Sequence, residues 1–532
     1  MKHNFLKFIL GAAVVSALLT GCGSDKAIEN KSAAKDEVSR LTFVNFRDIR
    51  DLNPHLYAGE MYAQEMLYET LVNIGEKGYE PCLAESWTIS EDGKVYTFNI
   101  RKGVTFSDGE VCDANAIKAN FDAIIENKSR HTWLEMMHLL ESVDVIDDYT
   151  IQMKMSKPYY PMLTELGVTR PFAMISPKAM KDGSTKNGVN EYIGTGAYIL
   201  KEFVTDEYAL FVANENYWGK VPEIKEILVK VIPDNQTRIL AMEKGEIDLI
   251  FGKNMIDADA INKYKNSEKF KIALSEPTST RQIVLNTNNG ILKEKPVRQA
   301  LQHATNKQAI SEGVFYGLEK PADTLFSKTT PYCNIDLKPY AFDTAQAEKM
   351  LDEAGWVKNS AGMREKEGQP LKLSLLYNSD SVTEKIISEY LQSEYKKIGV
   401  DMSIAGEEEQ SYRDKMKTGN FDMVFNICWG TPYDPQSSLA AMRQPVYGDY
   451  AAQLGLEDKK EIDEAITKIM TSTDEGERQE LYTFVLTRLH DDAVYIPVTY
   501  ECNKAIYNSS LKGVGFTQTQ YEVPFADMYF EK

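Results

Sequence analysis

Short runs in which apolar and polar residues alternate are interspersed with longer amphipathic runs, which predicts a mixture of β-strands and α-helices. In SWTISEDGKVYTFNIRKGVTFSDGE (86–110), aromatic and polar residues alternate on either side of Asp92-Gly93, as they do in a β-hairpin. Asp113 follows this stretch and is placed to cap an amphipathic helix over 114–126.

The same succession of elements recurs further along the chain. The spacing predicts a helix over 345–354 that ends at Gly355. LKLSLLYN (371–378) is typical of a buried strand, and an amphipathic helix is expected over 381–399. Strands and helices alternate without internal repeats, which indicates an α/β fold.

Residues 1–21 have the pattern of a secretory signal, in which lysines precede an apolar run from Phe8 to Leu19. The run is too short to span a bilayer, and small residues before Cys22 are the pattern that the lipoprotein peptidase recognises. We expect Cys22 to carry a lipid anchor at the extracytoplasmic face of the cell membrane, and the polar stretch that completes 22–40 to be a flexible tether. The alternative is a cleaved soluble protein with an incidental cysteine.

The composition favours a large exported body. About 490 residues follow the tether, more than one core usually holds, so two lobes are expected. A content of 43% hydrophobic and 10% aromatic residues is ample for their cores. The net charge of −19 argues against a nucleic-acid partner. No later stretch reaches the roughly 18 apolar residues of a membrane-spanning helix.

Beyond Cys22 the chain has five scattered cysteines without a CxxC pair, namely Cys82, Cys112, Cys333, Cys428 and Cys502. This set predicts neither a zinc ribbon nor a disulfide scaffold. We expect buried thiols, with a Cys82–Cys112 disulfide as the alternative in an oxidising compartment.

Several motifs in the same order resemble the large solute-binding proteins of ABC importers for peptides, opines and nickel. Besides the predicted hairpin, they are YIGTGAYIL (192–200), NENYWG (214–219), VIPDNQTRILAMEKGEIDLIFG (231–252), VRQALQHATNK (297–307) and AEKMLDEAGW (347–356). The resemblance runs from about Leu41 to the end. It implies a two-lobed α/β fold of the periplasmic-binding-protein type with the ligand in the cleft between the lobes. ABC permease and ATPase subunits are the implied partners.

Four further stretches are similar to the nickel-binding members of this family and would line the cleft: 53–71, 127–136, 159–172 and 428–443. The resemblance implies a first lobe of 41–281 plus 501–532 and a second lobe of 282–500. It also implies a monomeric receptor whose cleft closes around the ligand by a hinge.

The resemblance places Arg130, Trp133 and Arg170 at the ligand. A guanidinium cannot ligate a metal, because it is always protonated and offers only donors. Two arginines in a cleft therefore favour an anionic cargo, such as nickel(II) held by a small carboxylate-bearing chelator.

Flat side chains would form walls against this chelate and exclude water. On the resemblance these are Tyr57, Trp133, Trp429 and Tyr433, and Met61 lies near the ligand. For an isolated aromatic residue, ordinary core packing is the alternative.

One position departs from the nickel-binding pattern. Relatives carry a histidine in the loop after the MR.P motif, and here the loop MRQPVYGDY has Tyr447 at that position. Neutral tyrosine is a poor nickel ligand, so another residue ligates, the chelator fills the coordination sphere, or the cargo is a different metallophore complex. Arg443 nearby could supply a third cation for a more acidic, opine-type chelator.

The stretch RHTWLEMMH (130–138) is the other candidate metal site. If it begins a helix, Arg130 and Trp133 share one face, and His131 and Glu135 lie on an adjoining face. The stretch lacks the HExxH arrangement of zinc peptidases, which argues against catalysis. His131 is a candidate nickel ligand, with a surface position or a place behind the ligand residues as the alternatives.

Two other functions stay open at this point. A receptor for peptides or opines without nickel would need a carboxylate for an amino terminus, and Glu135, Glu165 and Asp434 are the candidates. An exported hydrolase would need a nucleophile elbow, a zincin motif or a pair of carboxylates, and none is evident. We therefore expect a binding protein without enzymatic activity.

Overall fold

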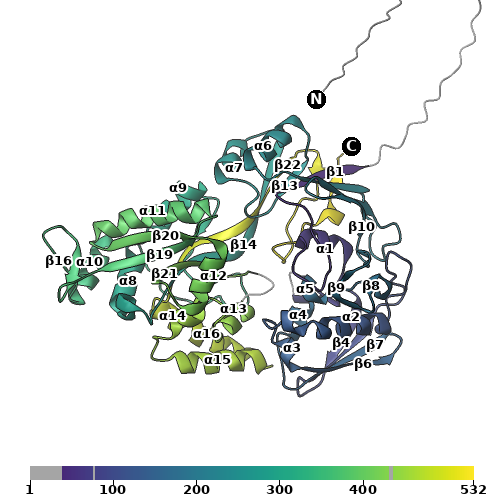
Figure 1. Ribbon diagram of the computed structural model, residues 1–532, viewed down its shortest axis with the longest axis horizontal. Coiled ribbons are helices and arrows are strands. Elements are labelled where there is room, and N and C mark those ends of the chain that lie inside the picture. The colour runs from purple at the N-terminus through teal and green to yellow at the C-terminus, as the bar shows by residue number, and fades with distance from the viewer. Residues whose placement is uncertain (1–38, 76–77, 431–434, 532) are drawn as a thin grey trace, which may run out of the picture. The chain divides into compact units, whose positions relative to one another are not determined.

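Two long antiparallel strands, β14 (Phe270–Leu285) and β22 (Tyr495–Asn508), run side by side from one lobe of the computed structural model to the other (Figure 1). The structure describes residues 39–75, 78–430 and 435–531. We call residues 39–269 and 509–531 the first lobe, and residues 286–494 the second lobe. The predicted boundaries at 281/282 and 500/501 both fall inside the paired strands.

Within the described residues, β14 and β22 belong to an eleven-stranded sheet with the order β10-β11-β12-β1-β13-β22-β14-β21-β19-β20, in which β15 pairs with β22. Parallel pairing joins β1 to β12 and β13, and β19 to β20 and β21. The bounds are β1 (Arg40–Asn45), β10 (Tyr198–Val204), β11 (Tyr208–Ala213), β12 (Glu226–Val231), β13 (Leu249–Phe251), β15 (Lys320–Pro321), β19 (Lys372–Asn378), β20 (Asp401–Glu407) and β21 (Met423–Ile427).

The first lobe carries a second sheet of four strands, with the order β4-β5-β7-β6. The predicted hairpin is confirmed as β4 (Ala84–Ile89) and β5 (Val95–Ile100), and Gly93 supplies the left-handed turn residue with φ +67°. The capped helix is confirmed as α2 (Ala114–Glu126), where Asp113 accepts a hydrogen bond of 2.9 Å from the Ala116 amide. It packs on β6 (Leu140–Asp147) and β7 (Thr150–Met155).

Shorter elements complete the first lobe. They are α1 (Met61–Leu67), β2 (Val72–Gly75), β3 (Gly78–Pro81), η1 (Lys128–Arg130), α3 (Met136–Leu139), α4 (Met162–Leu166), α5 (Thr169–Phe172), η2 (Pro177–Ala179), β8 (Met180–Lys181), β9 (Ser184–Val189), α6 (Asn235–Lys244), α7 (Ala258–Tyr264), β23 (Leu511–Lys512), η4 (Phe525–Asp527) and β24 (Tyr529–Phe530). The C-terminal segment packs into the core beneath β1 and β10–β12 through Phe525 and Val523.

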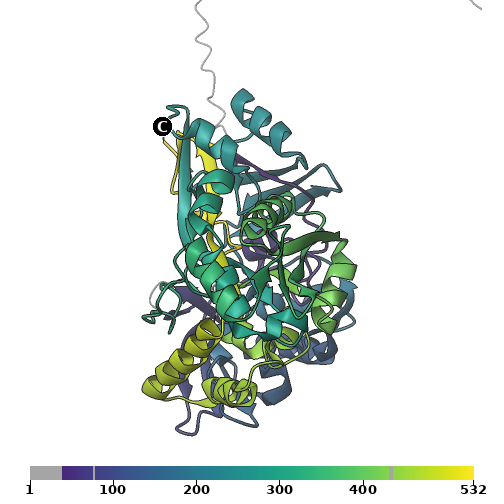
Figure 2. The same ribbon diagram turned by 90° about the vertical axis from the view of Figure 1, so that its left-hand side faces the viewer.

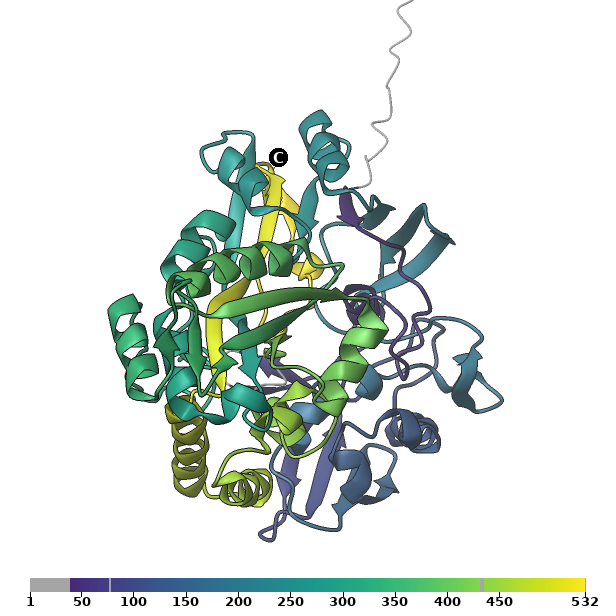
Figure 3. The same ribbon diagram turned by 60° about the vertical axis from the view of Figure 1, so that its left-hand side comes forward.

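Helices cover the strands of the second lobe, and Figure 3 shows the green α11 lying over the strands near the yellow β22. The predicted helix that ends at Gly355 is confirmed as α10 (Thr344–Glu353), and the strand–helix pair is confirmed as β19 and α11 (Val382–Lys397). The other elements are η3 (Gly290–Lys293), α8 (Lys295–His303), α9 (Lys307–Phe315), β16 (Val357–Lys358), β17 (Arg364–Lys366), β18 (Gln369–Pro370), α12 (Glu409–Thr418), α13 (Gln436–Ala441), α14 (Gly448–Gln453), α15 (Lys459–Thr471) and α16 (Glu475–Asp491).

The two lobes are also in contact at a place distant from β14 and β22. In Figure 2, α15 and α16 lie at the bottom of the molecule beside the dark blue strands of the first lobe. There the Tyr160 amide donates to the Met470 carbonyl at 3.0 Å, and Glu475 accepts hydrogen bonds of 2.5 Å from the hydroxyls of Tyr160 and Tyr332. These contacts set the approach of the lobes at the end opposite to α6 and α7.

The ladder between β14 and β22 is interrupted in its middle. Its register shifts between Leu274 and Pro277, between Pro277 and Ser279, and between Arg281 and Gln282. Bulges of this kind bend a strand and increase its local twist. The bends thus coincide with the passage of the sheet from one lobe to the other.

The five cysteines within the described residues are free and buried, so the thiol interpretation is confirmed and the alternative Cys82–Cys112 disulfide is not formed. In the same part of the chain, no helix combines the length and the apolar character that crossing a membrane requires.

Candidate ligand-binding site

Four aromatic side chains from both lobes form a row, which we call the aromatic row: Tyr57, Trp133, Trp429 and Tyr447. The ring centroids of successive members are 6.2, 6.4 and 5.1 Å apart. Successive rings meet edge to face, at interplanar angles of 63°, 89° and 81°. The structure therefore brings together four of the predicted ligand residues, which are spread over almost 400 positions of the sequence.

Hydrogen bonds fix the first member of the row. The Tyr57 hydroxyl accepts a bond of 2.9 Å from Trp133 Nε1 and lies 2.7 Å from His131 Nδ1. Arg170 Nη1 donates to the Tyr57 carbonyl at 2.8 Å. Burial of the hydroxyl raises the pKa of Tyr57 to about 12, so it stays neutral. A wall held in this way is preorganised for a ligand.

His131 lies behind Tyr57. It is fully buried, and its ring centroid is 5.6 Å from that of Tyr57. Burial, assisted by the positive charge of Arg130, lowers the pKa of His131 to about 4, so the imidazole is neutral at pH 7. Among the described residues, no group of three or more His, Cys, Asp or Glu side chains is arranged to hold a metal ion. Ligation of nickel by His131 remains a prediction.

The helix considered for residues 130–138 does not form over this stretch. Lys128–Arg130 form a short 3₁₀ turn, residues 131–135 are irregular, and α3 starts only at Met136. Three successive turn hydrogen bonds replace the helical ladder here, from the amides of Arg130, His131 and Leu134. This irregular backbone turns His131 into the core and leaves Trp133 in the aromatic row.

The three predicted arginines have different surroundings. Arg130 is exposed at the end of η1, and Arg170 is half-buried beside Tyr57. Arg443 instead pairs with Glu135 at 3.0 Å and donates to Thr467 Oγ1 at 2.9 Å. Its charge is thus matched by a carboxylate in this structure.

The structure describes one of the three remaining predicted positions. Met61 is the half-buried first residue of α1. Tyr433 and Cys22 lie outside the described residues, as does Asp434. Their predicted roles stay predictions.

An open cavity of about 1300 Å³ adjoins the aromatic row. Trp429 and Tyr447 form part of its lining, together with residues 253–254 and 256–259, the start of α11 and the helix α12. Charged side chains of both signs line it, among them Arg281 and Glu501. The second half of the aromatic row therefore borders this cavity.

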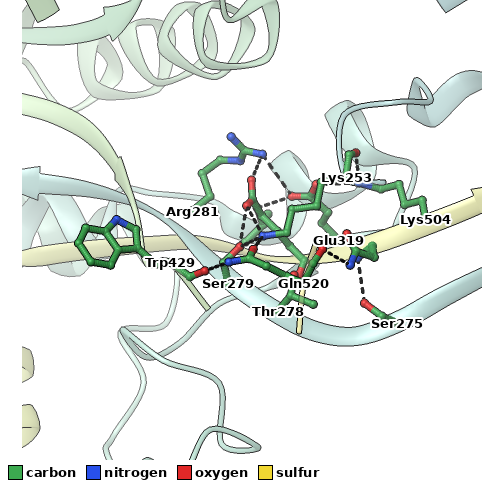
Figure 4. Close-up of polar contacts among 12 residues, drawn as sticks. Lys253, Ser275, Thr278, Ser279, Arg281, Glu319, Trp429, Lys504 and Gln520 are labelled. Carbon is green, nitrogen blue, oxygen red and sulfur yellow. Dashed lines mark hydrogen bonds and ion pairs between the residues drawn. The ribbon is translucent and has the colours of Figure 1, made fainter. Parts of the chain in front are cut away.

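A second set of residues at the site has no motif in the sequence. Gln520, from the C-terminal segment, donates from Nε2 to the backbone carbonyl of Trp429, and Lys253 Nζ binds Gln520 Oε1 (Figure 4). The only available signal is the occurrence of charged residues inside otherwise apolar strands, as in TRQIVLN and TYECNKAIY.

The family model for bacterial extracellular solute-binding proteins, family 5 (middle region), matches residues 78–449. The chain belongs to this family. The nickel-binding periplasmic protein of Escherichia coli (strain K12) is 41% identical over 498 residues, 93% of this chain and 94% of that protein. The dipeptide-binding protein of the same organism is 26% identical over 488 residues, 87% of this chain and 89% of that protein.

Among solved structures, NikA from Brucella suis in complex with Fe(III)-EDTA matches this family 5 protein with a TM-score of 0.91 at 44% identity, covering 92% of this chain and 100% of that chain. The expected two-lobed α/β fold is thereby confirmed. The resemblance to the nickel-binding members of family 5 is also confirmed.

Proposed function

We propose that the protein is the extracytoplasmic receptor of an ABC importer that captures nickel(II) as a chelate with a small carboxylate-bearing metallophore and delivers it to the permease. The aromatic row, with Arg170 held against its first member, is the observation that carries this proposal. It lies in a chain 41% identical to a nickel-binding periplasmic protein.

The side chains at the row suit a complex better than a bare ion. Planar rings pack against the chelator and exclude water, and Arg170 and Arg130 offer donors to its carboxylates. Neither ring nor guanidinium replaces the chelator as a metal ligand. Nickel is the cargo here, and its ligands come from the chelator.

Peptide binding is the weaker alternative, because Glu135 and Glu165, the two carboxylates proposed for an amino terminus that the structure describes, are engaged. Glu135 pairs with Arg443. Glu165 is buried, accepts hydrogen bonds from Tyr159 and from the Met136 amide, and has its pKa raised to about 8 by burial. Neither offers an open anionic site.

We further infer the cellular setting from the sequence. Cys22 would hold the protein on the membrane through its lipid, the residues between it and Ser39 would act as the tether, and the body would work as a monomer with permease and ATPase subunits. We expect no catalytic activity. Closure would bend β14 and β22 at their bulges, one of which lies at the predicted boundary 281/282.

Calorimetric titration of the tether-trimmed protein tests the proposal. Ni²⁺ alone is compared with Ni²⁺ plus free histidine and with Ni²⁺ plus a small polycarboxylate. We expect tight binding only with a chelator present. Equally tight binding of bare Ni²⁺ would show that the protein supplies the metal ligands, with His131 as the first candidate. Binding of dipeptides instead of the nickel chelate would favour a peptide receptor.

A further inference from the structure

Gln520 links the C-terminal segment of the first lobe to the wall of the ligand site. It is 5% exposed. Its Nε2 donates to the Trp429 carbonyl, its Oε1 accepts from Lys253 Nζ, and its own backbone carbonyl accepts from Asn503 Nδ2 at 2.8 Å. Because an ammonium group only donates, Lys253 fixes the Gln520 oxygen on its own side and turns the amide nitrogen towards Trp429.

Lys253 is itself held by the strands that join the lobes. Its Nζ donates to Ser279 Oγ at 2.6 Å and lies 3.8 Å from Glu501 Oε2. Ser279 belongs to β14 and donates in turn to Glu501 of β22 at 2.8 Å. The orientation of Gln520 therefore depends on residues of both strands.

Lys253 belongs to a group of five charged side chains that are largely withdrawn from water. We call this group the hinge network: Lys253, Arg281, Glu319, Glu501 and Lys504. Arg281 hydrogen-bonds Glu501 and lies 3.8 Å from Glu319, which is 3.3 Å from Lys504. Although burial acts to raise the pKa of Glu501, Arg281 and Lys253 hold it below its ordinary value, so Glu501 stays charged. Figure 4 shows this network on one side of Gln520 and the ring of Trp429 pointing away on the other.

The backbone next to Trp429 packs closely against β14. Gly430 has φ +74°, and a Cβ there would lie 1.6 Å from the carbonyl oxygen of Thr278 in β14. The chain after β21 is thus pressed against β14, with the Trp429 carbonyl directed at Gln520 and the ring between Trp133 and Tyr447. The hydrogen bond from Gln520 therefore ties an aromatic wall of the second lobe to the C-terminal segment of the first lobe.

We propose that Gln520, oriented by Lys253 and the hinge network, is a positioning residue that holds Trp429 in the aromatic row when the lobes are together. The expected effect of Gln520 on ligand affinity rests on the proposed function. The expected effect of Gln520 on the position of Trp429 does not. Removing the donor should loosen Trp429 and speed the release of the chelate.

Two substitutions separate this role from simple packing. Gln520→Glu keeps the acceptor for Lys253 but removes the donor to Trp429, and Gln520→Leu removes both. Gln518→Glu and Gln518→Leu are the matched controls, since Gln518 is exposed two residues earlier. Loss of one buried hydrogen bond predicts about tenfold weaker binding of Ni²⁺–histidine, mainly through faster dissociation, for both Gln520 variants.

The conformational effect is measured without ligand, by ¹⁹F NMR of protein carrying 5-fluorotryptophan at its five tryptophans. With the Trp429 signal assigned through Trp429→Phe, we expect both Gln520 variants to shift or broaden the Trp429 signal and the Gln518 variants to leave it unchanged. Thermal unfolding identifies any variant that fails to fold.

Lys253→Met tests whether Lys253 and Gln520 act on Trp429 together, a coupling that simple packing of Gln520 would not produce. Its effect on the Trp429 signal should not add to that of Gln520→Leu, whereas it should add to any effect of Gln518→Leu. An unchanged Trp429 signal in both folded Gln520 variants would overturn the positioning role. If the wild-type protein binds no nickel chelate but the Gln520 variants shift the Trp429 signal as expected, only the proposed function is overturned.

Discussion

Arg443 of the second lobe and Glu135 of the first lobe form an ion pair, with Arg443 Nη2 3.0 Å from Glu135 Oε2. Their side chains are 16% and 35% exposed, so the pair is partly withdrawn from water. Arg443 also donates to Thr467 of α15. The pair therefore joins the lobes beside the aromatic row, in a place where the sequence suggested a third cation for the ligand.

Removing either partner should weaken the closed arrangement. We expect Arg443→Met and Glu135→Gln each to lower the affinity for Ni²⁺–histidine up to about fivefold, since a pair of this exposure contributes up to about 1 kcal/mol. The double variant should be no weaker than Arg443→Met alone. Calorimetry on the three variants measures this, with Lys468→Met, from an exposed ion pair between α15 and α16, as the control. A far larger loss for Arg443→Met than for Glu135→Gln would mean that Arg443 contacts the ligand itself.

The two remaining arginines should matter for an anionic chelate and not for the fold. Arg170→Met and Arg130→Met each remove a charge-assisted donor, and we expect about 10- to 100-fold weaker binding, or about 1.5–3 kcal/mol. Lys128→Met is the control, because Lys128 is exposed on the same 3₁₀ turn as Arg130. Wild-type affinity in both arginine variants, measured by calorimetry, would refute the anionic-chelate model.

Tyr447→His should let the protein add a ligand to nickel. Tyr447 lies edge-on to Trp429, and an imidazole at this position is a good nickel ligand where a neutral phenol is not. We expect tighter capture of nickel with weak chelators such as free histidine, and little change for a chelator that already fills the coordination sphere. If titrations of both complexes match the wild type, residue 447 does not face the metal. Tyr450→His, three residues further on, tests for a nonspecific gain.

Glu165 should make stability depend on pH. Burial raises the pKa of Glu165 from an ordinary 4.5 to about 8, so the folded state holds this proton more tightly than the unfolded chain. Its protonation favours the fold at low pH, and this contribution is lost as the pH rises from about 4.5 through about 8. Each pH unit in this window changes the unfolding free energy by up to about 1.4 kcal/mol.

We therefore expect Glu165→Gln, which cannot ionise, to gain about 2–3 kcal/mol over the wild type between pH 6 and pH 8. Urea unfolding at the two pH values measures the difference. Glu141→Gln is the control, since Glu141 is exposed. Parallel pH profiles of Glu165→Gln and the wild type would mean that Glu165 is ionised in the folded protein.

Local signals in the sequence predict local structure well. Asp113 and Gly93 each act through neighbours a few positions away, so the capped helix and the hairpin turn are predictable from the sequence alone. The irregular stretch 131–135 is not, because its spacing also fits a helix, and the packing of His131 under Tyr57 decides otherwise. Tertiary contacts override weak helical propensity there.

The residues of the site likewise fall into those that the sequence predicts and those that it does not. The aromatic residues and arginines were predicted through motifs that resemble a known family, and the structure places four rings in one row. The contact between Gln520 and Trp429 joins positions 91 apart, and the pair of Arg443 with Glu135 joins positions 308 apart. Neither residue pair has a periodicity or spacing that marks it, because the contact exists only once the two lobes meet.

The hinge network also has an evolutionary consequence. Losing one member leaves a buried charge without its partner, which costs about 3–5 kcal/mol, whereas replacing a whole group of charges by well-packed apolar residues is often neutral or stabilising. Single substitutions at Lys253, Arg281, Glu319, Glu501 or Lys504 are therefore disfavoured one at a time. We expect these five positions to covary among descendants of this protein, being inherited together or exchanged together for uncharged side chains.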